Sequence, residues 1–69
     1  MNIAKNLKYL RIQSGLSYRK LGNIIDVPHT VIERVEKGLT ADPQISTVKK
    51  ICDYFKVSID EFVNEDFTK

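Results

Sequence analysis

Three polar side chains on one short predicted helix have the hydrogen-bonding groups and the spacing to contact a nucleotide edge or a phosphate. Thr30, Arg34 and Lys37 follow one another at intervals of three or four residues within 28–38, so they share one side of a helix. The opposite side carries aliphatic residues that fit a hydrophobic core. A hydrophobic core has no use for the polar groups of these three residues. We therefore interpret the side of the helix that carries them as a contact surface.

A second short helix is predicted immediately before this one, and it begins at a serine. Ser17 is a favourable N-cap, Asp26 tolerates the left-handed conformation expected at the following turn, and Pro28 suits the first turn of the next helix. Residues 17–38 therefore predict a helix-turn-helix. Such a motif places its second helix in the major groove of DNA while its first helix crosses the backbone.

The first turn of the earlier helix carries two cations, Arg19 and Lys20. The helix dipole is positive there and disfavours each cation by about 0.3–1 kcal/mol, so a sequence selected for stability alone would place acids at these positions. Phosphate binding at the helix start would explain the choice. We expect Ser17, Arg19, Lys20 and, from the following helix, Lys37 to contact DNA phosphates. The alternative is that the two cations serve only solubility.

Three further short helices are predicted to hold this motif, and no run of residues has the pattern of a strand. Asn2 can cap a helix to about Ser14, and Gly15 ends it; later helices are expected at about 45–55 and 59–64. The residues expected to face the core are Ile3, Leu7, Leu10, Leu21, Ile24, Ile25, Ile32, Val35, Ile45, Val48, Ile51, Cys52, Phe55, Ile59, Phe62 and Val63. The predicted fold class is all-α, with five helices in a single domain over 1–69 and a frayed tail over 65–69.

Two charged residues interrupt otherwise apolar stripes and are expected to pair. Arg11 lies at the edge of the stripe of the first helix, and Glu36 shares a helix face with Ile32. A charge at such a position needs a partner or must extend to solvent.

A glycine, Gly22, lies within the predicted second helix, where it costs roughly 1 kcal/mol of helix stability relative to alanine. Close approach of another helix would explain why a glycine occupies this position.

Composition sets the broad class of the protein. Its 69 residues are 42% hydrophobic and 29% charged, an ordinary globular composition, and no apolar run is long enough for a membrane span. The single cysteine, Cys52, cannot form an internal disulfide, which favours a reducing compartment such as the cytoplasm. We interpret it as a small buried hydrophobe, with a redox switch as the alternative.

Charge is unevenly distributed along the chain. Residues 1–20 hold five basic and no acidic residues, whereas residues 39–69 hold four lysines and six acids. This gradient suits a protein that approaches a polyanion in one orientation, although a random surface distribution would also produce it. Glu33 is interpreted as a helical partner of Lys37, four residues later, rather than as a reader of cytosine. Tyr9, Tyr54 and Phe67 are expected to be half-exposed, either at a dimer interface or without a role.

The order and spacing of these residues resemble the helix-turn-helix family of lambdoid phage repressor and Cro proteins, the XRE-like regulators. The likeness runs from about Leu7 to Val63. The residues that carry it are Arg11-Ile12-Gln13-Ser14-Gly15-Leu16-Ser17, Leu21, Val27, Ile32, Glu36-x-Gly38, Pro43 and Val57-Ser58-Ile59-Asp60-Glu61-Phe62. The chain departs from the family where Tyr18 replaces a frequent glutamine, Gly22 an alanine and Asp26 a glycine. The resemblance implies a five-helix DNA-binding domain, usually dimeric, in a transcriptional regulator.

The resemblance also implies roles for individual residues. It places the base-reading positions at His29, Thr30 and Arg34, and it implies a bridge between Arg11 and Glu36. A guanidinium can take guanine O6 and N7 together, an imidazole can donate to a purine N7, and Val31 can touch a thymine methyl group. Tyr18 stands where the family contacts the DNA backbone, and its phenol hydroxyl can bond a phosphate.

No pattern in the sequence indicates an enzyme. One histidine and one cysteine cannot form a four-ligand zinc site, and there is no glycine-rich phosphate loop, so neither metal nor cofactor is expected. The expected partners are an operator in double-stranded DNA and a second copy of the chain. The alternative is an antitoxin or anti-repressor that holds another protein, such as a toxin, through its acidic C-terminal third.

Overall fold

Five α-helices make up the regular secondary structure of the part of the chain that the structure describes. The computed structural model describes residues 2–40 and 43–69, within which there is no strand. The helices are α1 (Ile3–Gln13), α2 (Tyr18–Ile25), α3 (His29–Glu36), α4 (Ile45–Phe55) and α5 (Ile59–Asn64). The predicted all-α, five-helix class is confirmed. The predicted connection over 39–44 lies partly outside the described residues, at 41–42.

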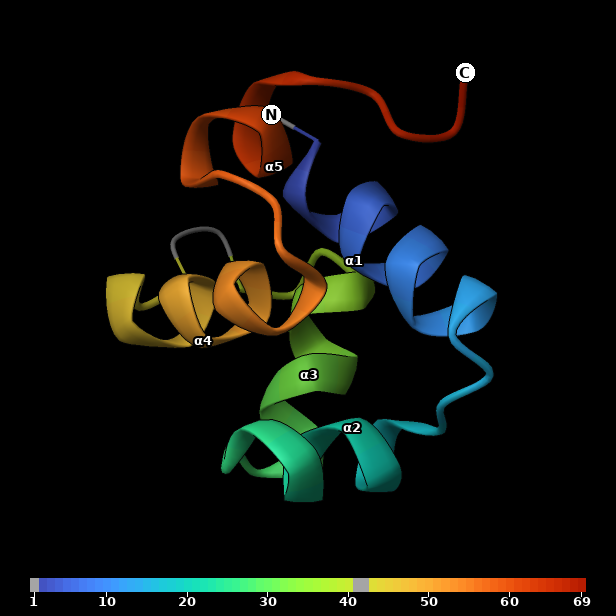
Figure 1. Cartoon of the computed structure of the whole chain (residues 1–69). Coiled ribbons are helices and arrows are strands. Elements are labelled where there is room, and N and C mark those ends of the chain that lie inside the picture. The colour runs from blue at the N-terminus through green and yellow to red at the C-terminus, as the bar shows by residue number, and fades with distance from the viewer. Residues whose placement is uncertain (1, 41–42) are drawn as a thin grey trace.

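The helix α3 crosses the middle of the molecule (Figure 1). It contacts α2 at the turn between them and contacts α1 along its side, while α5 packs on α1 and α4. The start of α1 lies beside the end of α5, where the Asn2 amide donates to the Val63 carbonyl at 2.8 Å. None of the helices in the described part of the chain has the length and apolar character to cross a membrane.

Apolar side chains from all five helices and from the turn between α2 and α3 form one core. Its members are Ile3, Leu7, Leu21, Ile25, Val27, Ile32, Val35, Val48, Ile51, Cys52 and Phe62. Three residues predicted to face inward are instead exposed: Ile24 is 45%, Ile45 68% and Ile59 38% accessible. Ile45 and Ile59 are the first residues of their helices, where the side chain points back beyond the packed turns. Ile24 lies at the edge of the narrow buried stripe of α2.

The turn between α2 and α3 is tight because Gly22 has no side chain. A Cβ atom at this position would lie 2.5 Å from the Val27 carbonyl oxygen and 3.2 Å from the His29 amide nitrogen. Asp26 adopts the expected left-handed conformation, with φ 60° and ψ 51°. Its carbonyl oxygen accepts a hydrogen bond of 3.1 Å from Lys50 Nζ, which fastens the turn to α4. The close approach predicted for Gly22 is therefore confirmed.

The C-terminal segment, residues 65–69, was expected to fray and lies packed on α1 in this structure. Asn6 is fully buried, and its side chain bonds one backbone group of α5 and two of this segment. Its Nδ2 donates to the carbonyls of Phe62 (2.8 Å) and Glu65 (2.7 Å), and its Oδ1 accepts from the Phe67 amide at 3.0 Å. The sequence reasoning did not consider a buried asparagine on the first helix, so this anchor was missed.

Asn2 occupies the position before α1 but does not cap it with its side chain. The amide nitrogen Nδ2 instead donates to the carbonyls of Asn64 at 3.2 Å and Glu65 at 3.0 Å. The end of α5 thus satisfies its free carbonyls with an asparagine from the other end of the chain. By contrast, α5 begins with a complete capping box, in which Ser58 and Glu61 bond each other's backbone amides.

Candidate nucleic-acid interface

The helix α3 buries one side and exposes the other. Ile32 and Val35 are 0% and 3% accessible, whereas Thr30 and Arg34 are exposed. His29 and Val31, at the beginning of the helix, are half-buried. The four residues expected to read bases therefore lie on the first two turns of α3, and two of them are freely accessible.

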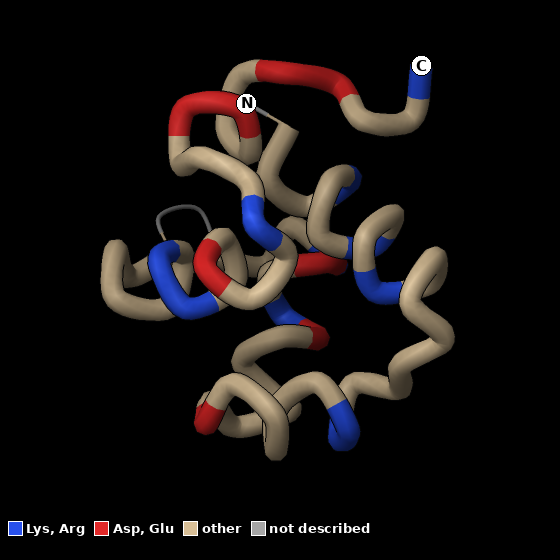
Figure 2. The backbone as a smooth tube through the Cα atoms, viewed as in Figure 1, with Lys and Arg blue, Asp and Glu red and all other residues tan. Residues whose placement is uncertain are grey.

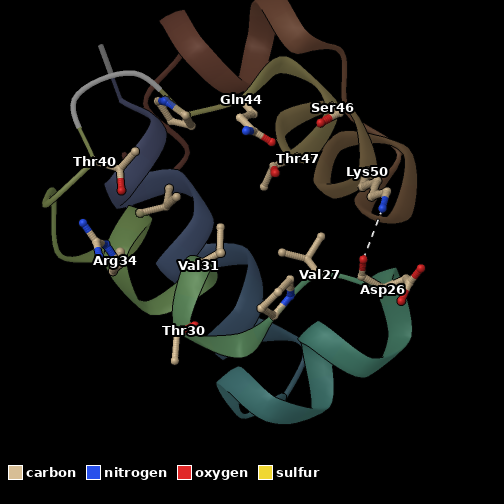
Figure 3. A pocket seen from close by; sticks show the side chains of 13 residues that line it. Asp26, Val27, Thr30, Val31, Arg34, Thr40, Gln44, Ser46, Thr47 and Lys50 are labelled. Carbon is tan, nitrogen blue, oxygen red and sulfur yellow. Dashed lines mark hydrogen bonds between the residues drawn. The ribbon is translucent and has the colours of Figure 1, made fainter.

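A hollow of about 560 Å³ separates this part of α3 from the beginning of α4. Thr30, Val31 and Arg34 line one wall, and Gln44, Ser46 and Lys50 line the opposite wall (Figure 3). The sequence analysis assigned no role to Gln44, which precedes α4, or to Ser46 and Lys50 within it. One sequence feature could have identified these residues. They stand at and near the N-terminus of a helix of 11 residues, where an amide and a hydroxyl side chain occur, and helix N-termini attract anions.

The beginning of α2 is basic and carries no acid in its first turn. The Ser17 hydroxyl oxygen accepts a hydrogen bond from the Lys20 amide at 3.0 Å, so the predicted N-cap is confirmed. Arg19 and Lys20 are exposed, and none of the carboxylates in 2–40 and 43–69 pairs with either side chain. Two cations at the positive end of a helix dipole make this a region of positive potential.

Lys37 forms an ion pair with Glu33. Its Nζ lies 2.7 Å from Glu33 Oε2, four residues earlier. The hydrogen bond between them raises the pKa of Lys37 and lowers the pKa of Glu33. Of the two roles considered for Glu33, the structure shows the ion pair. Because both side chains are in contact with solvent, the pair can exchange for a phosphate at little cost.

Arg11 and Glu36 form a bidentate ion pair that joins α1 to the end of α3. Nε lies 2.6 Å from Oε2 and Nη2 lies 3.1 Å from Oε1, while Nη1 donates to the Leu16 carbonyl at 2.8 Å. The side chains are only 13% and 2% accessible. The hydrogen bond to Glu36 raises the pKa of Arg11 above its ordinary value.

Tyr18 lies beneath this ion pair. The Arg11 guanidinium carbon is 4.3 Å from the centre of the Tyr18 ring, a cation–π contact. The sequence reasoning placed Tyr18 only at the DNA backbone. Its half-buried ring instead joins the first residue of α2 to the contact between α1 and α3.

Charged residues are unevenly distributed over the molecule. Figure 2 shows lysines and arginines along α1, on α4 and at the beginning of α2, and acidic residues gathered on α5 and the C-terminal segment. Within the described residues, no group of three His, Cys, Asp or Glu side chains is placed to hold a metal ion. Cys52 is 2% accessible, and burial raises the pKa of its thiol.

Comparison with known protein families shows which family the chain belongs to. Residues 7–62, from α1 into α5, match the family described as helix-turn-helix. The chain belongs to this helix-turn-helix family. The membership confirms the resemblance drawn from the sequence, and the expectation that the chain is not an enzyme agrees with it, because the similar proteins are regulators.

The relatives of this helix-turn-helix chain are transcriptional regulators. The chain is 33% identical over 61 residues to the HTH-type transcriptional regulator PuuR of Escherichia coli. This match covers 88% of the chain and 32% of PuuR. The HTH-type transcriptional regulator PuuR of Shigella flexneri gives the same values. It is 26% identical over 65 residues to an uncharacterised HTH-type transcriptional regulator of Coxiella burnetii, covering 94% of this chain and 30% of that protein. The chain thus spans about a third of the length of these relatives. No solved structure gives a significant match.

Proposed function

We propose that the chain is a sequence-specific DNA-binding transcriptional regulator that places α3 in the major groove. The observation that carries this proposal is the two-sided character of α3. Thr30 and Arg34 are exposed on the side opposite to the buried Ile32, on a helix that lies close against α2 at Gly22. Membership of the helix-turn-helix family and the names of the relatives support it.

In this proposal α3 supplies the contacts that distinguish bases. Arg34 binds guanine O6 and N7 with two donors, which is the commonest specific contact in the major groove. Thr30 bonds a base or a neighbouring phosphate, His29 donates to a purine N7, and Val31 packs against a thymine methyl group. Because α3 is only eight residues long, its reading is confined to a few base pairs in each half-site.

The phosphate contacts come from both ends of the motif. Ser17, Tyr18, Arg19 and Lys20 approach one strand from the start of α2, and Lys37 approaches from the end of α3. The polar wall of the hollow, with Gln44, Ser46 and Lys50, faces α3 from α4 and is suited to phosphate oxygens as well. These contacts set the register of α3 on the duplex and make the affinity depend on salt.

We further propose that two copies bind a partly palindromic operator, with half-sites about one helical turn, roughly 34 Å, apart. A protein that acts on genomic DNA in this way works in the cytoplasm. The Arg11–Glu36 pair has a structural role in this assembly: it sets the angle of α3 relative to α1.

Selection of bound oligonucleotides from a random pool tests the proposal directly. We expect enrichment of a partly symmetric sequence with two half-sites. Titration of the selected duplex at increasing salt should show a linear fall of log affinity with log salt, with a slope of about −0.9 for each phosphate neutralised. Recovery of unrelated sequences, or binding that ignores salt, would contradict the proposal.

A protein-docking module, such as an antitoxin or anti-repressor, is the second candidate. The acidic residues gathered on α5 and the C-terminal segment favour it, because Asp60, Glu61 and Glu65 are all exposed. The same titration separates the two functions. A docking module would show little affinity for DNA at any salt concentration, whereas a regulator binds DNA tightly at low salt.

A further inference from the structure

Glu33 is the only acidic residue on the exposed side of α3, the side that carries Thr30, Arg34 and, just after the helix, Lys37. The second carboxylate of the helix, Glu36, is 2% accessible and paired with a residue of α1. By contrast, the Glu33 side chain is 37% accessible. A carboxylate there repels the phosphates that the proposed function brings to α3, so a sequence selected for affinity alone would place an uncharged or basic residue at this position.

Glu33 is bonded to Lys37, four residues later. The distance between Lys37 Nζ and Glu33 Oε2 is 2.7 Å, and the Lys37 side chain is 54% accessible. The hydrogen bond lowers the pKa of Glu33, which is therefore ionised at neutral pH. Since the two charges cancel, the exposed side of α3 presents the single positive charge of Arg34 to an approaching duplex.

The ammonium of Lys37 lies near the phosphate contacts proposed for the beginning of α2. The hydrogen bond to Glu33 raises the pKa of Lys37, and a smaller contribution comes from Tyr18, the first residue of α2. To bond a phosphate, Lys37 must leave Glu33, which costs little for a solvent-exposed pair once a phosphate is held beside the ammonium. Base contacts of α3 hold the duplex in one register and supply that phosphate. In a loose complex with random DNA no register is held, so the pair remains intact.

We propose that Glu33 is a specificity-determining residue that keeps Lys37 away from the phosphates of random DNA and releases it on the operator. The inference rests on the proposed function, in which Lys37 contacts a phosphate. Binding to random DNA comes essentially from neutralised phosphates, so the loss of one cation lowers it directly. On the operator, the base contacts of α3 bring the phosphate into place, and Lys37 then adds to the affinity. Glu33 thus widens the difference in affinity between the operator and random DNA.

Replacement of Glu33 by glutamine should free Lys37 on every duplex. Each phosphate neutralised adds about 0.9 to the slope of log affinity against log salt, which is roughly eightfold in affinity at about 0.1 M salt. Glu33→Gln should therefore bind random DNA about five to ten times more tightly than the wild type, with a slope steeper by about 0.9. On the operator, where Lys37 is already released, the gain should be about threefold or less, with little change in slope. Equal gains on both duplexes, or weaker binding of the operator, would overturn the proposal.

The double variant Glu33→Gln with Lys37→Gln replaces the ion pair by two uncharged side chains. On random DNA it should bind as the wild type does, because the net charge at the two positions is zero in both proteins. On the operator it should bind about five to ten times more weakly, because the phosphate contact of Lys37 is lost. Two charges that acted in the same way on every duplex would leave both affinities unchanged, and this result would contradict the release of Lys37 on the operator.

Glu65→Gln is the matched control for the change in net charge. It removes the same charge from an exposed carboxylate of the C-terminal segment, at the opposite end of the molecule from α2 (Figure 1). Both affinities and both salt slopes should match those of the wild type, and circular dichroism verifies that each variant is folded. A gain on random DNA equal to that of Glu33→Gln would show that only the net charge of the chain matters, and the role of Glu33 would be ruled out.

Titration of the selected operator and of a random duplex over a salt series, with the full chain, separates failure of this inference from failure of the proposed function. A wild-type chain that does not prefer the operator contradicts the proposed function, and the role of Glu33 fails with it. If the wild type prefers the operator and Arg34→Ala reduces that preference, base reading by α3 stands. A Glu33→Gln variant that then keeps the wild-type affinity for random DNA overturns the role of Glu33 alone.

Discussion

The Arg11 guanidinium carbon lies 4.3 Å from the centre of the Tyr18 ring. The same guanidinium is bonded to Glu36 and to the Leu16 carbonyl. One planar group therefore joins α1, the connection before α2, the first residue of α2 and the last residue of α3. Any change in the angle between the two helices of the motif must disturb at least one of these contacts.

Tyr18→Leu should lower the free energy of unfolding by about 0.5–2 kcal/mol, the range of a cation–π contact that is partly shielded from water. Tyr18→Phe keeps the ring and should retain wild-type stability. Urea denaturation of the three proteins gives the comparison. Equal losses in both variants would show that the hydroxyl group, rather than the ring, provides the stabilisation. Tyr18→Phe also tests the proposed phosphate contact, because it should weaken binding to all DNA sequences.

Glu36→Ala should cost about 3–5 kcal/mol of stability, because it leaves the poorly accessible Arg11 guanidinium without its anion. The double variant Arg11→Met with Glu36→Leu replaces both charges by apolar groups and should recover most of the loss. Thermal unfolding followed by circular dichroism measures both. A double variant as unstable as Glu36→Ala would mean that the geometry of the ion pair, and not only the removal of a lone charge, maintains the fold.

Gly22→Ala should destabilise the protein although alanine is the better helix former. The gain in helix propensity is about 1 kcal/mol. Against it, the new Cβ would lie 2.5 Å from the Val27 carbonyl oxygen, a backbone atom that cannot rotate away. We expect a net loss of about 1–3 kcal/mol, typical of overpacking. Asn23→Ala is the control, because it changes the neighbouring exposed position and should stabilise the helix slightly. If Gly22→Ala were also stabilising, the turn would have room to open.

Arg34→Ala and Arg19→Ala should have different effects on DNA binding. Arg34→Ala is expected to cost about 1–3 kcal/mol on the selected site and to relax the preference at one base position. Arg19→Ala should weaken binding to every duplex equally and reduce the salt slope by about 1. Competition assays with specific and random duplexes make the measurement. Identical behaviour of the two variants would remove the division between base reading and phosphate contact.

Acid should release the C-terminal segment through Asp66. Hydrogen bonds from the side chain and backbone of Thr68, with a smaller contribution from Lys5, lower the pKa of this carboxyl from 3.8 to about 2. Ionised Asp66 therefore stabilises the folded segment above pH 3.8, and the contribution is lost as the pH falls towards 2. The NMR shifts of the Asp66 carboxyl and the Phe67 amide should follow this titration together. Asp66→Asn should abolish the step, and a Phe67 shift that still moves in that variant would assign it to another group.

Local sequence signals determined the helices, their order and the motif. Ser17, Pro28, the Ser58–Glu61 capping box and the spacing of aliphatic residues act over a few residues of chain, so their consequences can be derived without the fold. The opposite polarity of the two sides of α3 follows from the same spacing. For this reason the exposed Thr30 and Arg34 and the buried Ile32 were all predicted correctly.

What only the tertiary structure decided concerns residues that meet across the chain. Periodicity could not show that Asn6 would bond Phe67, 61 residues later, that Tyr18 would lie under Arg11, or that α4 would face α3 across a hollow. Periodicity also predicted Ile45 and Ile59 in the core, whereas both side chains are exposed. Helical spacing gives the direction of a side chain but does not show how far the neighbouring elements extend over it. The physical reason is that such contacts depend on how helices cross, and crossing angles are set by the packing of whole surfaces rather than by any short run of sequence.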